Sequence, residues 1–218
     1  NIQSRTNVLG NIFFSMFLML SVLAGIDPQW CWVIVGFIAF TAILYIMRGG
    51  LQAGVFTDAM QAVAMIVASL VLWSVVWYST GGWDGLHARL SAVDPALPGR
   101  LLHVGGYSPD GVPPVIVVFG FIVVLTMYVV VNQYEAIRFL GARSEWDFKM
   151  ATLVAAVATA ICLWFNVTMG PLAHADFPEL LQPDQAYPLM VAKYLPPGLV
   201  GLVMAGVIAG GDSTFDSI

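Results

Sequence analysis

The sequence predicts an all-α membrane protein, a polytopic bundle of transmembrane helices, and three observations lead to this fold class. Hydrophobic residues make up 59% of the 218-residue chain. Charged residues make up only 10%, against about 25% in soluble domains. The mean hydropathy is +0.85, and the apolar residues gather in long runs. Polar groups are therefore too few to cover a water-facing surface, and the apolar surplus is expected to face lipid.

Six runs reach or approach the length of about 20 apolar residues that a helix needs to cross a bilayer. Helices are expected because lipid offers no partner to backbone N–H and C=O groups. A transmembrane β-barrel would need alternating segments, and continuous apolar runs such as 115–119 do not alternate. The predicted spans are 7–25, 30–47, 55–78, 114–131, 150–171 and 197–218.

The basic residues predict how these spans are oriented. Six spans place five of the Lys and Arg residues on one side and three on the other; the larger group is Arg5, Arg48, Arg138, Arg143 and Lys149. Short cytoplasmic loops carry the excess of Lys and Arg. We therefore expect both ends of the sequence in the cytoplasm and external loops at 79–113 and 172–196. Aromatic residues near the span ends fit an interfacial belt: Trp30, Trp32, Tyr45, Trp77 and Tyr78.

These features predict an integral membrane protein, expected in a bacterial inner (plasma) membrane, with the lipid bilayer as a partner. No basic stripe suggests a nucleic-acid partner. The sequence starts without Met, and its last predicted span is still running where it stops. We expect both ends to be cut, and the piece to belong to a longer chain.

Small residues mark one face of the last span. Gly206, Gly210, Ser213 and Ser217 follow one another at spacings of four, three and four, so they lie on one side of a helix. Gly206 and Gly210 form a GxxxG pair, which lets a neighbouring helix approach closely. A tight helix contact is the structural interpretation of this face.

The polar end of the last span has two interpretations. If the helix ended at Gly211, the polar residues of 212–217 would be solvated or capping residues. If it continues, Asp212, Ser213 and Thr214 lie at membrane depth, where ionisable residues are costly and usually functional. Adjacent hydroxyls and loosened backbone carbonyls suit a hard cation, which prefers several oxygen ligands. Both interpretations stay open from the residues alone.

A second polar stretch occupies 48–61. Asp58 followed by Gln61 fits a helix N-cap with its capping-box partner. The 21 residues from Asp58 to Tyr78 span about 31 Å at 1.5 Å per residue, a complete crossing. Asp58 would then start a helix at the cytoplasmic interface, with Gly49 and Gly50 forming the preceding turn.

Both stretches resemble the sodium:solute symporter family. Residues 196–217 match P-x-G-L-x-G-L-x-x-A-G-x-x-A-x-x-x-S-T-x-D-S, and residues 49–61 match G-G-L-x-A-x-x-x-T-D-x-x-Q. The resemblance implies six transmembrane helices of a ten-helix inverted-repeat core of the LeuT type, about core helices three to eight. Residues 1–218 would then form a partial transmembrane transporter domain, completed by the missing helices of the same chain.

The same resemblance implies a sodium site. Ser213 and Thr214 would give side-chain oxygens and Gly210 a backbone carbonyl to Na⁺, which acts as a coupling ion and not as a prosthetic group. Asp58 would lie near the path by which Na⁺ leaves for the cytoplasm. Asp212 departs from the family, which usually has an apolar residue there, often Met. Either the ion pathway is more acidic than usual, which leaves room for protons, or Asp212 points toward another polar partner.

The fourth span resembles core helix six of the family. Asn132, Gln133 and Arg138 match its N-Q-x-x-x-x-R pattern. The resemblance implies that Tyr128, Asn132 and Gln133 line the substrate cavity, with Tyr128 as an aromatic lid, although packing would also explain an aromatic residue there. Leu125 replaces the polar residue of sugar transporters, whereas residues 81–86 look like their branch of the family. The identity of the solute therefore stays open.

The family resemblance implies sodium-coupled symport of a small organic solute by alternating access. The alternative is a membrane-embedded sensory module of the same fold, fused to a signalling domain. An enzyme is not expected, because the sequence has no nucleophile–base pair, HExxH motif or phosphate-binding loop.

Overall fold

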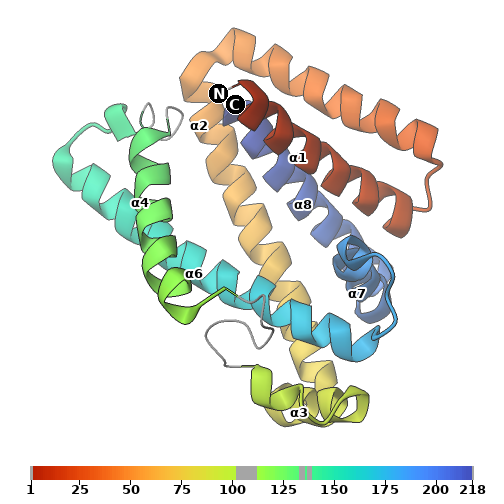
Figure 1. The fold of residues 1–218 in the computed structure, drawn as a ribbon. Coiled ribbons are helices and arrows are strands. Elements are labelled where there is room, and N and C mark those ends of the chain that lie inside the picture. The colour runs from red at the N-terminus through yellow and green to blue at the C-terminus, as the bar shows by residue number, and fades with distance from the viewer. Residues whose placement is uncertain (1, 102–111, 133–135, 137–138, 218) are drawn as a thin grey trace. The chain divides into compact units, whose positions relative to one another are not determined.

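The computed structural model describes residues 2–101, 112–132, 136 and 139–217, and every regular element among them is a helix (Figure 1). The predicted all-α fold class is confirmed. The chain divides into two compact units. One joins Asn1–Leu86 with Ala158–Ile218, and the other is His87–Val157.

The first unit is built mainly from α1 (Ile2–Leu23), α2 (Pro28–Thr80), the end of α6 (Glu145–Asp176), α7 (Ala186–Tyr194) and α8 (Pro197–Ser217). Its core lies between α1, α2 and α8. Met16 and Leu20 of α1 are buried with Cys31 and Val35 of α2, and Met204 and Ile208 of α8 pack against them.

α2 contains two arms joined at a single glycine. Gly50 has φ 60° and ψ −157°, a conformation that essentially only glycine adopts. The two arms, Pro28–Gly50 and Gln52–Thr80, are each long and apolar enough to cross a membrane. The turn agrees with the prediction for Gly49 and Gly50. The second arm, however, starts at Gln52, so Asp58 lies inside a helix and the capping-box interpretation was wrong.

In the described part of the chain, five helical segments have the length and composition of membrane spans: Arg5–Leu23, Pro28–Gly50, Gln52–Thr80, Glu145–Asp176 and Pro197–Thr214. Large apolar side chains on them are exposed, such as Phe37 at 65% and Val63 at 61%, as lipid-facing residues would be. A shorter apolar helix, Ile116–Tyr128, falls within the predicted span 114–131. The six span boundaries stay a prediction.

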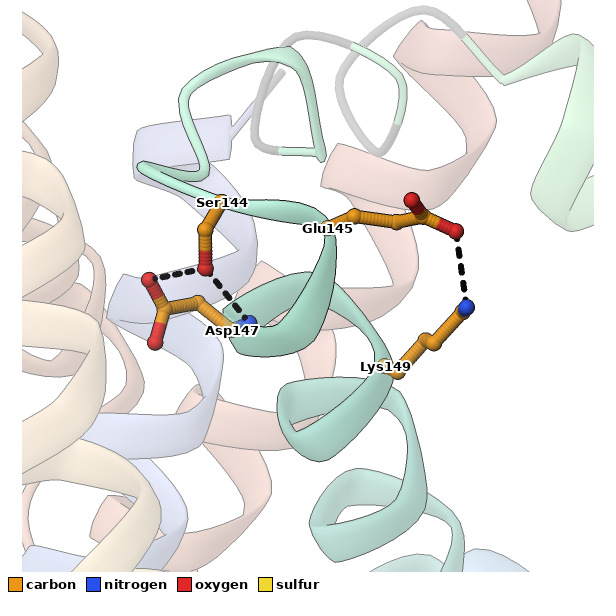
Figure 2. Close-up of polar contacts among 4 residues, drawn as sticks. All are labelled: Ser144, Glu145, Asp147 and Lys149. Atoms are coloured by element: carbon orange, nitrogen blue, oxygen red, sulfur yellow. Dashed lines mark hydrogen bonds and ion pairs between the residues drawn. The ribbon is translucent and has the colours of Figure 1, made fainter.

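The second unit holds most of α3 (Gly82–Val93), the short helices η1 (Pro98–Arg100) and η2 (Ile116–Gly120), α4 (Phe121–Val131) and the start of α6. α6 begins at Glu145, earlier than the predicted 150, because its start is capped (Figure 2). The Ser144 hydroxyl accepts from the Asp147 backbone N–H at 3.1 Å and donates to the Asp147 carboxylate at 2.8 Å. Lys149 pairs with Glu145 at 2.7 Å, one turn apart.

The stretch between α6 and α8, predicted as an external loop, contains α7. An ion pair ties α7 to the end of α6. Lys193 Nζ lies 3.0 Å from Asp176 Oδ2, and the Tyr194 hydroxyl donates to the same carboxylate at 2.5 Å. The Asp176 side chain is only 6% exposed, so its charge is compensated where it is buried.

Candidate functional site

The two stretches singled out in the sequence meet in the structure, because α8 packs along the second arm of α2 (Figure 1). As residue numbers fall along α8, those of their partners rise along α2, so the two helices run antiparallel. Four contacts mark the interface: Ser213 with Asp58, Asp212 with Gln61, Gly210 with Met65 and Gly206 with Ala68.

The glycines of α8 allow this close approach. A Cβ built on Gly206 would lie 2.5 Å from the Ala68 Cβ and 3.3 Å from the Ala64 carbonyl oxygen. One built on Gly210 would lie 2.8 Å from the Met65 sulfur. On another side of α8, a Cβ on Gly211 would collide with Met16 of α1. The small face predicted from the spacing therefore contacts α2, and its neighbouring glycine contacts α1.

Two of the three predicted sodium ligands are bonded to each other. The Thr214 hydroxyl donates to the Gly210 carbonyl oxygen at 3.0 Å. Both residues line a cavity of about 310 Å³ between α1 and α8, to which Asn11 and Ser15 of α1 also belong. Polar residues from two helices thus lie along one small, open cavity.

The third predicted ligand, Ser213, points toward α2. Its hydroxyl donates to a carboxylate oxygen of Asp58, and both side chains are partly buried. The structure therefore brings the predicted release-path carboxylate into direct contact with a predicted sodium ligand. Asp58 and Ser213 are 155 residues apart in the sequence.

Asp212 lies beside this pair and has partners on both arms of α2. Its Oδ2 accepts a hydrogen bond from Gln61 Nε2 at 2.8 Å and a longer one from the Tyr45 hydroxyl at 3.5 Å. This geometry corresponds to the second alternative for Asp212, a carboxylate directed at other polar groups. Gln61 and Tyr45 were not predicted as site residues, since the local patterns suggested a capping box and an interfacial aromatic.

The predicted substrate-cavity residues belong to the other unit. Tyr128 lies near the end of α4 and is 53% exposed. Asn132 is the C-cap of α4, and its backbone N–H donates to the Tyr128 carbonyl oxygen at 3.0 Å. Gln133 lies outside the residues that the structure describes. The role of these three residues in a substrate cavity stays a prediction.

A larger cavity of about 430 Å³ in the first unit was not predicted. It is bounded by α1, the second arm of α2, the end of α6, α7 and α8, and Gly210 borders both this cavity and the smaller one. Its polar lining residues are Ser15, Ser69, Asn166, Asp184 and Tyr187. Burial raises the pKa of the Tyr187 hydroxyl to about 12. The lining comes from distant segments, so no local motif could have indicated it.

Comparison with known proteins supplies the family. A family model described as the sodium:solute symporter family matches residues 10–218. The chain is 27% identical over 82% of its length to a sodium/pantothenate symporter of Haemophilus influenzae. It is 28% identical over 85% to a sodium/myo-inositol cotransporter 2 of Bos taurus, and 27% identical over 94% to a sodium/glucose cotransporter 4 of Danio rerio.

The matched region covers 36%, 32% and 35% of these three relatives. The chain therefore spans about a third of their length. All three are named as transporters and none as an enzyme, in agreement with the expectation from the sequence. The pantothenate, myo-inositol and glucose of their names describe those proteins.

Proposed function

Since the chain belongs to the sodium:solute symporter family, we propose that it is part of an integral membrane protein that couples sodium entry to the uptake of a small organic solute. The observation that carries this proposal is the meeting of α2 and α8. It places Ser213 against Asp58, on the same turn of α8 as the hydrogen-bonded pair Thr214 and Gly210.

The oxygens on this turn of α8 suit a sodium ion. Na⁺ is a hard cation and takes oxygen ligands, as other hard cations do. The Thr214 hydroxyl donates its hydrogen bond to the Gly210 carbonyl, so the lone pairs of the hydroxyl oxygen remain to face a cation. We propose that Gly210, Ser213 and Thr214 supply part of the coordination and that other helices of the whole protein supply the rest.

Asp58 is proposed to receive the ion on its way to the cytoplasm. It lies close along the chain to the Gly50 turn, which the charge distribution predicts to be cytoplasmic. Its contact with Ser213 gives Na⁺ a carboxylate next to its binding oxygens. In an alternating-access cycle, the membrane potential adds about 2.3 kcal/mol per charge per 100 mV to the complete crossing of the ion.

The test removes both hydroxyls from the full-length protein in proteoliposomes. Ser213→Ala combined with Thr214→Ala should abolish sodium-stimulated uptake and sodium binding measured with radioactive Na⁺. Pantothenate, myo-inositol and glucose are the solutes to assay first. The matched control is Thr41→Ala with Ser91→Ala, because each of those exposed hydroxyls bonds a carbonyl of its own helix. Undiminished sodium binding and uptake in the site variant would refute the assignment.

A further inference from the structure

Asp212 is a carboxylate in the last turn of the candidate membrane span Pro197–Thr214, and the proposed coupling site does not use it. It accepts from Gln61 on the second arm of α2 at 2.8 Å and from Tyr45 on the first arm at 3.5 Å. One side chain of α8 thereby touches both arms on either side of the Gly50 turn. The resemblance predicts an apolar residue at this position, which could accept neither bond.

The side-chain amide of Gln61 is hydrogen-bonded through its NH2 group only, within the part of the chain that the structure describes. Its Oε1 is buried and has no hydrogen-bond partner among the residues described, while its Nε2 donates to Asp212. Asp212 therefore determines where this partly buried amide points. Without an acceptor on α8, the amide would lose its hydrogen bond to Asp212 while its Oε1 stays buried, and an unsatisfied buried polar group is costly.

The register of α8 against α2 connects this contact with the sodium site. Asp58 and Gln61 are three residues apart and lie on one face of α2, and their partners Ser213 and Asp212 are neighbours on α8. A rotation or slide of α8 that broke the bond to Gln61 would also move Ser213 away from Asp58.

We propose that Asp212 is a positioning residue. It joins α8 to both arms of α2 and keeps Ser213 against Asp58, and it does not bind the cation itself. The effect of Asp212 on sodium binding rests on the proposed function, whereas its contact with Gln61 does not. What the position requires is a hydrogen-bond acceptor and not a negative charge.

Two substitutions in the full-length protein separate these requirements. Asp212→Asn keeps a carbonyl oxygen for Gln61 and Tyr45 but removes the charge, so the sodium concentration for half-maximal radioactive Na⁺ binding should stay within about twofold of wild type. Asp212→Met keeps a side chain of suitable length without a good acceptor. It should raise that concentration about three- to twentyfold, the range expected for lost interhelical hydrogen bonds.

The residues that donate to Asp212 provide a second set of variants. Gln61→Leu and Tyr45→Phe should weaken sodium binding in the direction of Asp212→Met. Gln52→Leu and Tyr78→Phe are the matched controls, since they make the same changes at exposed positions of α2, and they should bind like wild type. The double variant Gln61→Leu with Asp212→Met should bind sodium no more weakly than the more severe single variant, because both substitutions remove the same hydrogen bond.

The same set of variants is measured by thermal unfolding of the purified protein, which needs no sodium. Non-additive shifts for Gln61 and Asp212 support the contact even if wild type binds no Na⁺, a result that would refute the proposed function alone. Two outcomes overturn the inference. In one, Asp212→Asn loses as much sodium affinity as Asp212→Met; in the other, the shifts in unfolding temperature of the Gln61 and Asp212 variants simply add.

Discussion

Polar side chains of the apolar helices bond across helix boundaries in the first unit. Thr168 of α6 accepts from the Trp73 indole N–H at 2.9 Å and donates to its own helix at Trp164. Ser213 of α8 donates to Asp58 of α2, also between two helices. Each such pair avoids the cost of leaving a polar group unsatisfied away from water. Removing one side chain of a pair should therefore lower the free energy of unfolding by more than the worth of the hydrogen bond, because the other polar group stays away from water without a partner.

Tyr187 of α7 predicts a pH effect at the residue scale. Its pKa is raised to about 12 in the folded protein by burial, against about 10 in an unfolded chain. The folded state holds the proton more tightly, so this contribution to stability is complete below pH 10 and is lost as the pH rises toward 12. The unfolding temperature of wild type should fall more steeply over this interval than that of Tyr187→Phe.

Tyr78→Phe is the control for this measurement. It removes a hydroxyl from a ring that is 89% exposed, and its unfolding curve should follow wild type at every pH. Parallel curves for wild type and Tyr187→Phe between pH 10 and 12 would contradict the prediction.

At the scale of the elements, the contact between α8 and the second arm of α2 depends on residues without bulk. Gly206 is buried against Ala64 and Ala68, whereas nothing lies within 4 Å of a Cβ built on Gly201 in the same helix. Both glycines are helical, but a Cβ would meet neighbouring atoms at Gly206 and none at Gly201. Substitution at both separates the effect of overpacking from that of helix propensity.

Gly206→Ala should lower the free energy of unfolding by about 1–3 kcal/mol, the usual cost of adding a methyl group to a packed interface. Gly201→Ala should be neutral or stabilise by up to about 1 kcal/mol, because alanine favours the helix. Denaturant unfolding of the purified protein measures both. Equal stability of the two variants would show that the helices do not approach as closely as α8 and α2 do here.

At the scale of the whole molecule, the charge distribution predicts the orientation in the membrane. The Gly50 turn is expected on the cytoplasmic side and the connection between α6 and α7 outside. Cysteines at Gln52 and at Leu181, which is 96% exposed, would report on these two places once Cys31 and Cys162 are replaced by alanine.

An impermeant maleimide applied to intact cells should label Leu181→Cys and should label Gln52→Cys only after the membrane is permeabilised. The same protein without an introduced cysteine is the control for background labelling. The reverse pattern would mean that the small excess of basic residues on the predicted cytoplasmic side does not determine the orientation.

Much of the fold and part of the site could be predicted from local patterns. Apolar runs indicated the helices because lipid forces backbone groups to bond within one segment. The glycine pair at 49–50 indicated the turn because Gly50 has a conformation that other residues rarely adopt. The spacing of small residues indicated the close face of α8. Asp58 was placed at a helix start because a capping box is a local signal, and the helix extends back to Gln52 instead.

By itself, then, the sequence determined the all-α membrane fold and the family, and it singled out the polar residues of 48–61 and 212–217. Only the tertiary structure decided which of them meet. Asp212 is 151 residues from Gln61 and 167 from Tyr45, and Ser213 is 155 from Asp58. A hydrophobic pattern places a helix in lipid but leaves its rotation and register free. Those follow from how the glycines of α8 pack against α2, a property of two helices together and not of either one.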